Sequence, residues 1–214
     1  MDAIASRADR PQRTSAALAP TKLERAAALA GLLLLGIQGA PARAQVRTAA
    51  ARAAPPATIW VYPVIRGYGG VHPRPDLAGP PPDVDYRVIA DVVHGSRDPR
   101  RVAGSLVRLA RLVNLMGYGK VPRGDVHIAA VIEGRAGFAA LSNAAYRKRF
   151  HVDNPNLALL GELERAGVKL MVCSQALAEN GLRDGDVAPG IEITLSALTD
   201  FALYGARGYS YLQL

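Results

Sequence analysis

Three apolar stretches of this 214-residue chain each end in a side chain that can do chemistry, namely His94, Glu133 and Cys173. If these stretches are parallel strands of one sheet, their carboxyl ends meet at one rim, where such sheets bind ligands. A base, a carboxylate and a thiol would then occupy equivalent positions on three strands. This combination suits thiol chemistry, with Cys173 as the reacting group and His94 and Glu133 as its catalytic neighbours.

Cys173 is the only cysteine, and Ser174 and Gln175 follow it at the start of a predicted helix. The partial positive charge of a helix N-terminus stabilises a thiolate, the form that attacks or carries sulfur. A nearby His94 would add to this effect. Alternatively, Cys173 only packs at a strand end, because free cysteines are among the most buried residues. A single cysteine excludes an internal disulfide and a cysteine-cluster metal site.

His94 and Glu133 also have simpler interpretations. His94 could be a strand-end residue bonded to backbone, and Glu133 could cap the next helix or pair with Arg135. The glycines that follow the two residues let the backbone come close to a ligand or to a neighbouring segment. The candidate ligand contacts at the rim are Gly95, Gly134, Ser174 and Gln175.

The sequence predicts neither a metal nor a cofactor. The other histidines, His72, His127 and His151, are not spaced as ligands with any acid. There is no GxGxxG motif, no phosphate-binding P-loop and no GxSxG elbow. The glycines of residues 67–70 lie in a proline-rich segment and are better explained as bends.

The domain proper begins near Tyr86 and alternates between β-rich apolar stretches and amphipathic stretches. Strands that are apolar on both faces and alternate with helices indicate a parallel sheet covered by helices. We therefore predict an α/β fold, a three-layer sandwich with a central, mostly parallel sheet of about five strands. The predicted strands are residues 87–93, 125–134, 168–173, 191–196 and 209–212.

Helices are expected between these strands. Asp98 and Pro99 are typical of an N-cap followed by proline at the first helical position, so one helix is predicted from Pro99 to Gly117. Its apolar face contains Leu106 and Leu109. Further helices are predicted at 136–142, 143–150, from 154–156 to Gly167, at 174–180 and at 197–206.

Residues 1–44 have the order of a secretory signal peptide. A polar, basic stretch precedes an apolar run at 26–38, and the small-residue pattern Ala42-Arg43-Ala44 follows. The apolar run of about 13 residues is shorter than the roughly 20 that a spanning helix needs. An uncleaved anchor and a buried core helix are the alternatives. We expect a bacterial periplasmic or secreted protein that has no membrane contact after cleavage.

Residues 45–85 are expected to form a Pro/Gly-rich arm. Eight of the 15 prolines lie between Pro55 and Pro82. Repeated prolines exclude a helix and cannot donate in a central strand. Because the arm also contains Trp60 and Tyr62, we expect it to lie on the domain, residues 86–214, or on a neighbouring subunit. A flexible linker is the alternative.

The composition is globular, with 50% hydrophobic and 21% charged residues. The net charge is +8, and because six basic and three acidic residues lie in 1–44, the rest carries +5. The bases are scattered, aromatic residues do not interleave with them, and no recognition module is present. Nucleic acid is therefore not expected as a partner.

From Tyr86 onward the chain resembles the DsrE/DsrF-like family of sulfur-relay and sulfur-oxidation proteins. The resemblance lies in VVHGS (92–96), ALSNAAYRKRF (140–150), DNPNLALLGELERAGVKLMVCSQ (153–175) and IEITLSALTDFALYGARGYSYLQL (191–214). The arm sequence GYGGVHPRPDL also resembles the leader of exported members. The family implies a parallel α/β sandwich that assembles into homo- or hetero-oligomers.

The resemblance further implies a strand-end cysteine that carries persulfide sulfur between partner proteins, and only Cys173 matches that position. The chain departs from the family in two ways. Glu133 and Gly134 stand where many relatives are expected to have His-Gly, and this chain is predicted to be exported.

Three functions follow from the sequence. The first is a sulfur carrier or sulfurtransferase in which Cys173 accepts sulfur from a donor protein, His94 tunes the thiolate and Gln175 holds the terminal sulfur. The second is a non-catalytic, homo-oligomeric module that binds a small ligand or a protein at the rim, with Cys173 merely packed. The third, a hydrolase or oxidoreductase with a bound cofactor, has no supporting motif. Whether the protein is an enzyme stays open at this point.

Overall fold

The computed structural model describes residues 59–214. The predicted signal peptide at 1–44 and the first part of the predicted arm lie outside the described residues. Among the described residues, no helix is both long and apolar enough to cross a membrane.

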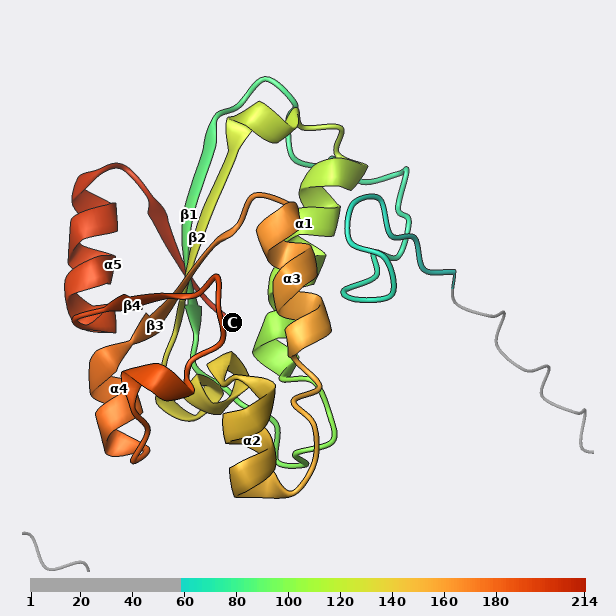
Figure 1. The fold of residues 1–214 in the computed structure, drawn as a ribbon. Coiled ribbons are helices and arrows are strands. Elements are labelled where there is room, and N and C mark those ends of the chain that lie inside the picture. Colours follow the sequence, from blue (N-terminus) through green and yellow to red (C-terminus); the bar gives the residue numbers. More distant parts are fainter. Residues whose placement is uncertain (1–58) are drawn as a thin grey trace, which may run out of the picture. The chain divides into compact units, whose positions relative to one another are not determined.

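Five parallel strands form one sheet with the order β4-β3-β2-β1-β5 (Figure 1). This confirms the predicted α/β class and the mostly parallel central sheet. The strand order runs outward from β1 to β4 and then returns to the other side of β1. The strands are β1 (Tyr86–Val92), β2 (Val126–Ile132), β3 (Lys169–Cys173), β4 (Glu192–Thr194) and β5 (Ser210–Gln213).

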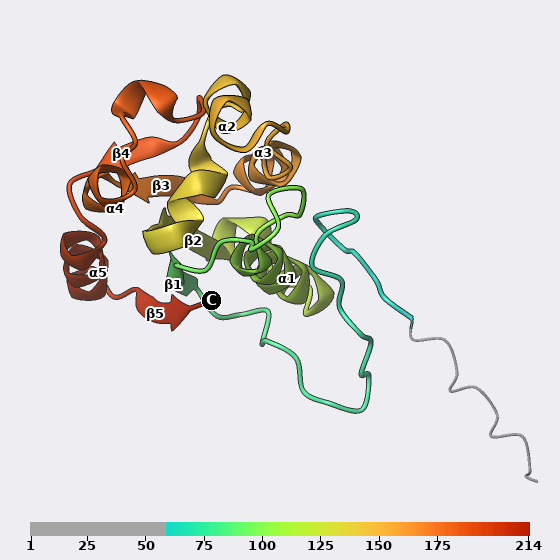
Figure 2. The same ribbon diagram turned by 90° about the horizontal axis from the view of Figure 1, so that it is seen from below.

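Helices cover both faces of the sheet, which makes the three layers seen end-on in Figure 2. On one face lie α1 (Gly104–Tyr118) and α3 (Leu157–Arg165), and on the other lies α5 (Ala197–Ala206). The carboxyl ends of the strands adjoin a 3-10 helix at Gly134–Ala140, α2 (Asn143–Phe150) and α4 (Ser174–Glu179).

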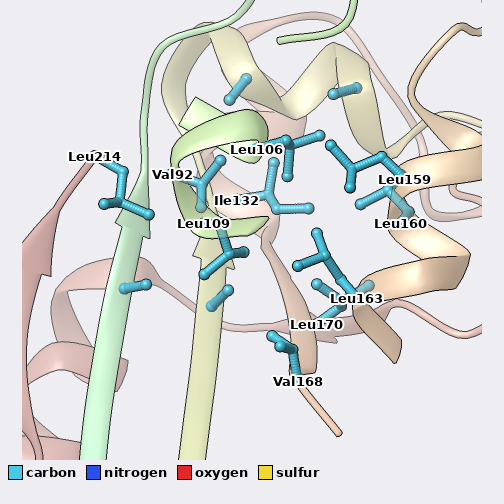
Figure 3. Close-up of a cluster of buried hydrophobic side chains, with 14 of the residues drawn as sticks. Val92, Leu106, Leu109, Ile132, Leu159, Leu160, Leu163, Val168, Leu170 and Leu214 are labelled. Carbon is cyan, nitrogen blue, oxygen red and sulfur yellow. The ribbon is translucent and has the colours of Figure 1, made fainter. Parts of the chain in front are cut away.

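The two faces of the sheet have separate hydrophobic clusters because side chains alternate along each strand. The larger cluster joins the sheet to α1 and α3, with Leu106, Leu109 and Leu163 fully buried (Figure 3). The smaller cluster lies under α5 and contains Val131, Cys173 and other apolar side chains. Cys173 therefore points toward α5, away from α1 and α3.

The predicted start of the first helix at Pro99 is wrong. The Arg100 amide donates to Asp98 Oδ1 at 2.9 Å, which forms a local turn instead of a helical N-cap. The Ala103 amide then donates to Asn156 Oδ1 at 2.8 Å, and α1 begins at Gly104. The predicted helix at 136–142 is likewise a 3-10 helix that starts earlier, at Gly134.

The described part of the arm lies on α1. The Asn114 side chain accepts from the amides of Val64 and Ile65 at 2.9 and 2.8 Å, and donates to three arm carbonyls between 2.9 and 3.1 Å. Ile65 is buried in the larger hydrophobic cluster. A Cβ at Gly69 would lie 2.2 Å from the Arg111 backbone nitrogen, so the contact with α1 requires glycine there.

Candidate functional site

The rim of the sheet on the α5 side brings Cys173 and Glu133 together. The pairing of β2 with β3 places Ile132 beside Val172, so the next residue pair is Glu133 beside Cys173. Val131 lies under α5, and Glu133 follows it by two residues, which puts Glu133 on the same face as Cys173. The carboxylate and the thiol predicted from the sequence thus lie at equivalent positions, with Glu133 directly after β2 and Cys173 at the end of the adjacent β3.

Cys173 is buried, with 3% of its surface exposed. The Ala197 amide, at the start of α5, donates to the Cys173 sulfur at 3.3 Å. The sequence predicted a helix directly after Cys173, and α4 begins there. However, the amide that reaches Sγ belongs to α5, whose position over the thiol could not be inferred from sequence spacing.

Ser174 and Gln175 hold the segment that covers the thiol. The Ser174 hydroxyl donates to the Leu195 carbonyl at 2.8 Å, and the Gln175 amide donates to the same carbonyl at 3.2 Å. Leu195 precedes the N-cap of α5, Ser196. Both predicted ligand contacts therefore tie the end of β3 to the lid formed by residues 195–198.

His94 does not join Cys173. Its backbone amide donates to the Ser105 hydroxyl of α1 at 3.3 Å, on the opposite side of the sheet from α5. Its side chain is exposed, and in residues 59–214 it makes no hydrogen bond or ion pair with Cys173 or Glu133. The β2 strand also separates β1, which precedes His94, from β3.

Gly95 and Gly134 allow two rim loops to pack closely. A Cβ at Gly95 would lie 2.6 Å from the Arg135 carbonyl oxygen, and Gly134 has a left-handed φ of +50°. Gly95 also lines a cavity of about 70 Å³ with Arg97, Arg135 and Phe138.

Sequence reasoning missed Asp91, a buried acid on β1 with 3% of its surface exposed. The Tyr211 hydroxyl donates to Asp91 Oδ2 at 2.7 Å, and the Gln213 amide donates to the same oxygen at 3.3 Å. Its other oxygen, Oδ1, has no hydrogen-bond partner among the described residues. The available signal was an aspartate within an otherwise apolar strand.

Asp91 lies close enough to Glu133 to affect the pKa of the Glu133 carboxyl. Burial raises the pKa of the Glu133 carboxyl, and the negative charge of the nearby Asp91 raises that pKa further. A smaller contribution comes from the charge of Glu179 on α4. The hydrogen bond to Asp91 raises the pKa of Tyr211 to about 12. The rim therefore favours a proton on Glu133 and on Tyr211.

A second cavity lies between the arm and α1. It has a volume of about 530 Å³, within the range of small-molecule sites, and is lined by Trp60, Tyr62, Tyr68, Arg101 and Arg111 among others. The Arg111 guanidinium lies 5.6 Å from the centre of the Trp60 ring. From the sequence, the glycine-rich segment beside this cavity is interpreted only as a set of bends. The aromatic residues nearby are the one sequence feature that could have indicated the cavity.

No group of three or more His, Cys, Asp or Glu side chains within residues 59–214 is arranged to hold a metal ion.

The fold and the rim define a parallel α/β sandwich with a thiol and carboxyl groups at the carboxyl ends of its strands. The sequence model of the DsrE/DsrF-like family matches residues 88–214, more than half of the chain. The chain therefore belongs to the DsrE/DsrF-like family.

Comparison with solved structures found a similar fold in a protein of unknown function from Methanobacterium thermoautotrophicum. That protein is 21% identical, and the alignment covers 61% of this chain and 100% of that chain, with a TM-score of 0.46. A comparison with curated proteins found no match.

Proposed function

We propose that this protein carries sulfane sulfur as a persulfide on Cys173, within a sulfur-relay system. Membership of the DsrE/DsrF-like family supports a function of the sulfur-relay type. The observation that carries the proposal is the hydrogen bond from the Ala197 amide to the Cys173 sulfur. An N–H donor at the start of a helix stabilises negative charge on a thiolate or a persulfide at that position.

The transfer step is a displacement at sulfur. The Cys173 thiolate attacks the terminal sulfur of a donor persulfide, R–S–SH. A new S–S bond forms at Cys173, the donor S–S bond breaks, and the donor leaves as R–S⁻. The terminal sulfur keeps its proton and its oxidation state, so the step needs no oxidant. Delivery to an acceptor thiolate is the same reaction in reverse.

Access to Cys173 requires the lid, residues 195–198, to move. Leu195 and Leu198 flank the Ala197 amide and are 72% and 79% exposed. Two such exposed leucines on a short segment suit contact with a protein partner. We infer that a sulfur donor or acceptor protein binds here and displaces the lid, and that this happens in the periplasm or outside the cell if residues 1–44 direct export.

Burial of the thiol favours a second function, a non-catalytic oligomeric module. In that case Cys173 is part of the small hydrophobic cluster, and a small ligand or a protein binds at the rim. The two functions differ in one measurable property, because only the carrier exposes Cys173 to sulfur donors in the folded state.

The deciding experiment exposes the folded protein to polysulfide and measures its intact mass. The carrier gains sulfur on Cys173, and the Cys173→Ser variant gains none. Alkylation of Cys173 under native conditions, compared with alkylation in denaturant, reports how often the lid opens. If wild-type protein gains no sulfur while the denatured chain does, the non-catalytic function is correct.

A further inference from the structure

The two oxygens of Asp91 are in unequal environments. Oδ2 accepts hydrogen bonds from Tyr211 and Gln213, while Oδ1 has no partner among the described residues. Buried carboxylate oxygens are nearly always hydrogen-bonded, because an unsatisfied buried charge is costly. A donor for Oδ1 is therefore expected from a neighbouring side chain.

Glu133 is the group that can supply this donor. It follows β2, the strand next to β1, and the pairing places Asp91 beside Val131, two residues before Glu133. Asp91 and Glu133 thus lie on the same face of the sheet, with Asp91 on β1 and Glu133 two residues beyond its partner position on β2. Since a carboxylate cannot donate, Glu133 can satisfy Oδ1 only in its protonated form.

Neither Asp91 nor Glu133 is paired with a cation among the described residues. Tyr211 and Gln213 face Asp91 from β5, Cys173 is beside Glu133 on β3, and the charge of Glu179 acts from α4. Phe201 of α5 packs against the Tyr211 ring at 5.0 Å. Within residues 59–214, neither acid forms an ion pair with Lys, Arg or His. When a buried carboxyl and a half-buried carboxyl lie side by side without a cation, ionisation of one disfavours ionisation of the other.

We propose that Asp91 and Glu133 share one proton, which Glu133 donates to Asp91 Oδ1, and that this carboxyl pair relays protons for sulfur transfer at Cys173. The relay rests on the proposed function, whereas the shared proton does not. The location of the Asp91–Glu133 pair also agrees with the strand order of the sheet. The strand order reverses between β1 and β5, and such a reversal at the carboxyl ends is where α/β sheets place their ligands.

Protons and bonds are conserved in the relay when Cys173 starts as a thiol. The thiol proton passes to the carboxylate of the pair, which then holds two protons. The resulting thiolate attacks R–S–SH, forming Cys173–S–SH and releasing R–S⁻. The pair protonates R–S⁻ to R–SH and returns to its singly protonated state. Glu133, next to Cys173, passes its own proton to Asp91 Oδ1 as it takes the thiol proton, and the two protons move back when R–S⁻ is protonated. Tyr211 and Gln213 hold Asp91 Oδ2 throughout.

Infrared spectroscopy of the full chain tests the shared proton without reference to sulfur. The spectrum at neutral pH is expected to contain a carboxylic acid C=O band that disappears in both Asp91→Asn and Glu133→Gln. The matched control, Glu179→Gln, is expected to retain the band. Absence of the band from wild-type protein, or its persistence in Glu133→Gln, would overturn the shared proton.

The relay is tested by the rate of sulfur uptake at Cys173 from a low-molecular-weight persulfide across pH. Glu133→Gln is expected to lower the rate on the order of 100-fold and to remove one step from the pH profile. An unchanged rate and profile, with the infrared band present, would overturn the relay alone. Failure of wild-type Cys173 to take up sulfur would overturn the relay and the proposed function together, and the infrared band would still decide the shared proton.

Discussion

The Ala197 amide and the Cys173 sulfur lie 3.3 Å apart, so the first turn of α5 closes over the only thiol of the chain. This contact joins residues 24 positions apart, from the end of one strand and the start of a helix on the sheet face. It gives the thiol a hydrogen-bond donor and removes it from solvent at the same time. Any reaction at Cys173 is therefore coupled to movement of the lid.

The first prediction concerns this contact. In Cys173→Ala the Ala197 amide loses its acceptor, whereas in Cys173→Ser the hydroxyl oxygen still accepts from it. Hydrogen exchange at Ala197, measured relative to amides of β3, is expected to be faster in Cys173→Ala than in Cys173→Ser. Equal exchange in the two variants would show that the sulfur contributes nothing to holding the lid.

A second prediction follows from the raised pKa of Glu133. Because the folded protein binds this proton more tightly than the unfolded chain, Glu133 lowers stability as pH rises from its ordinary pKa of 4.5 through the raised value. Glu133→Gln lacks this loss, so its free energy of unfolding should rise relative to that of wild type over the same interval. The gain is expected to be about 1 kcal/mol or less, because solvent screens a partly exposed carboxyl.

Urea denaturation at several pH values measures this effect. At pH values below the ordinary carboxyl pKa, wild type and Glu133→Gln should differ little in their pH dependence. Glu162→Gln is the matched control, since Glu162 pairs with Arg165 on the exposed surface. A Glu133→Gln curve parallel to that of wild type at all pH values would contradict a raised pKa.

The third prediction concerns the arm. Asn114 is fully buried and makes five hydrogen bonds to the arm backbone, so Asn114→Leu leaves several buried polar groups without partners. The loss is expected to be about 3 kcal/mol or more in the free energy of unfolding, with faster proteolysis within residues 59–80. Leu115→Ala, at a partly exposed neighbouring position, should leave the arm protected.

The fourth prediction compares two glycines. Gly95→Ala would bring a Cβ to 2.6 Å from the Arg135 carbonyl oxygen, whereas Gly104→Ala meets nothing within 4 Å. Gly95→Ala is therefore expected to destabilise the protein by about 1 to 3 kcal/mol, and Gly104→Ala to be neutral or slightly stabilising. Thermal unfolding of the two variants distinguishes a packing role for Gly95 from one confined to ligand contact.

The sequence predicted the parallel sheet and the position of Cys173 because apolar residues occupy both faces of each strand. It could not show that His94 lies apart from Cys173, because the contact between the His94 amide and Ser105 of α1 is a tertiary contact. Asp91 was missed since its partner Tyr211 is 120 residues away. Asp98 and Pro99 misled the helix prediction because the same residues also form a turn, and the Asn156 contact that sets the true start is distant in sequence.

The docking of the arm constrains the order in which the chain folds. Val64 and Ile65 bind Asn114, which follows them by 50 and 49 residues, so the arm cannot settle until α1 has been made and formed. During synthesis, the arm emerges before α1 and joins the domain late. A recombinant fragment that begins at Tyr86 would leave the Ile65 site on α1 open to water, so the boundary for expression should precede residue 59.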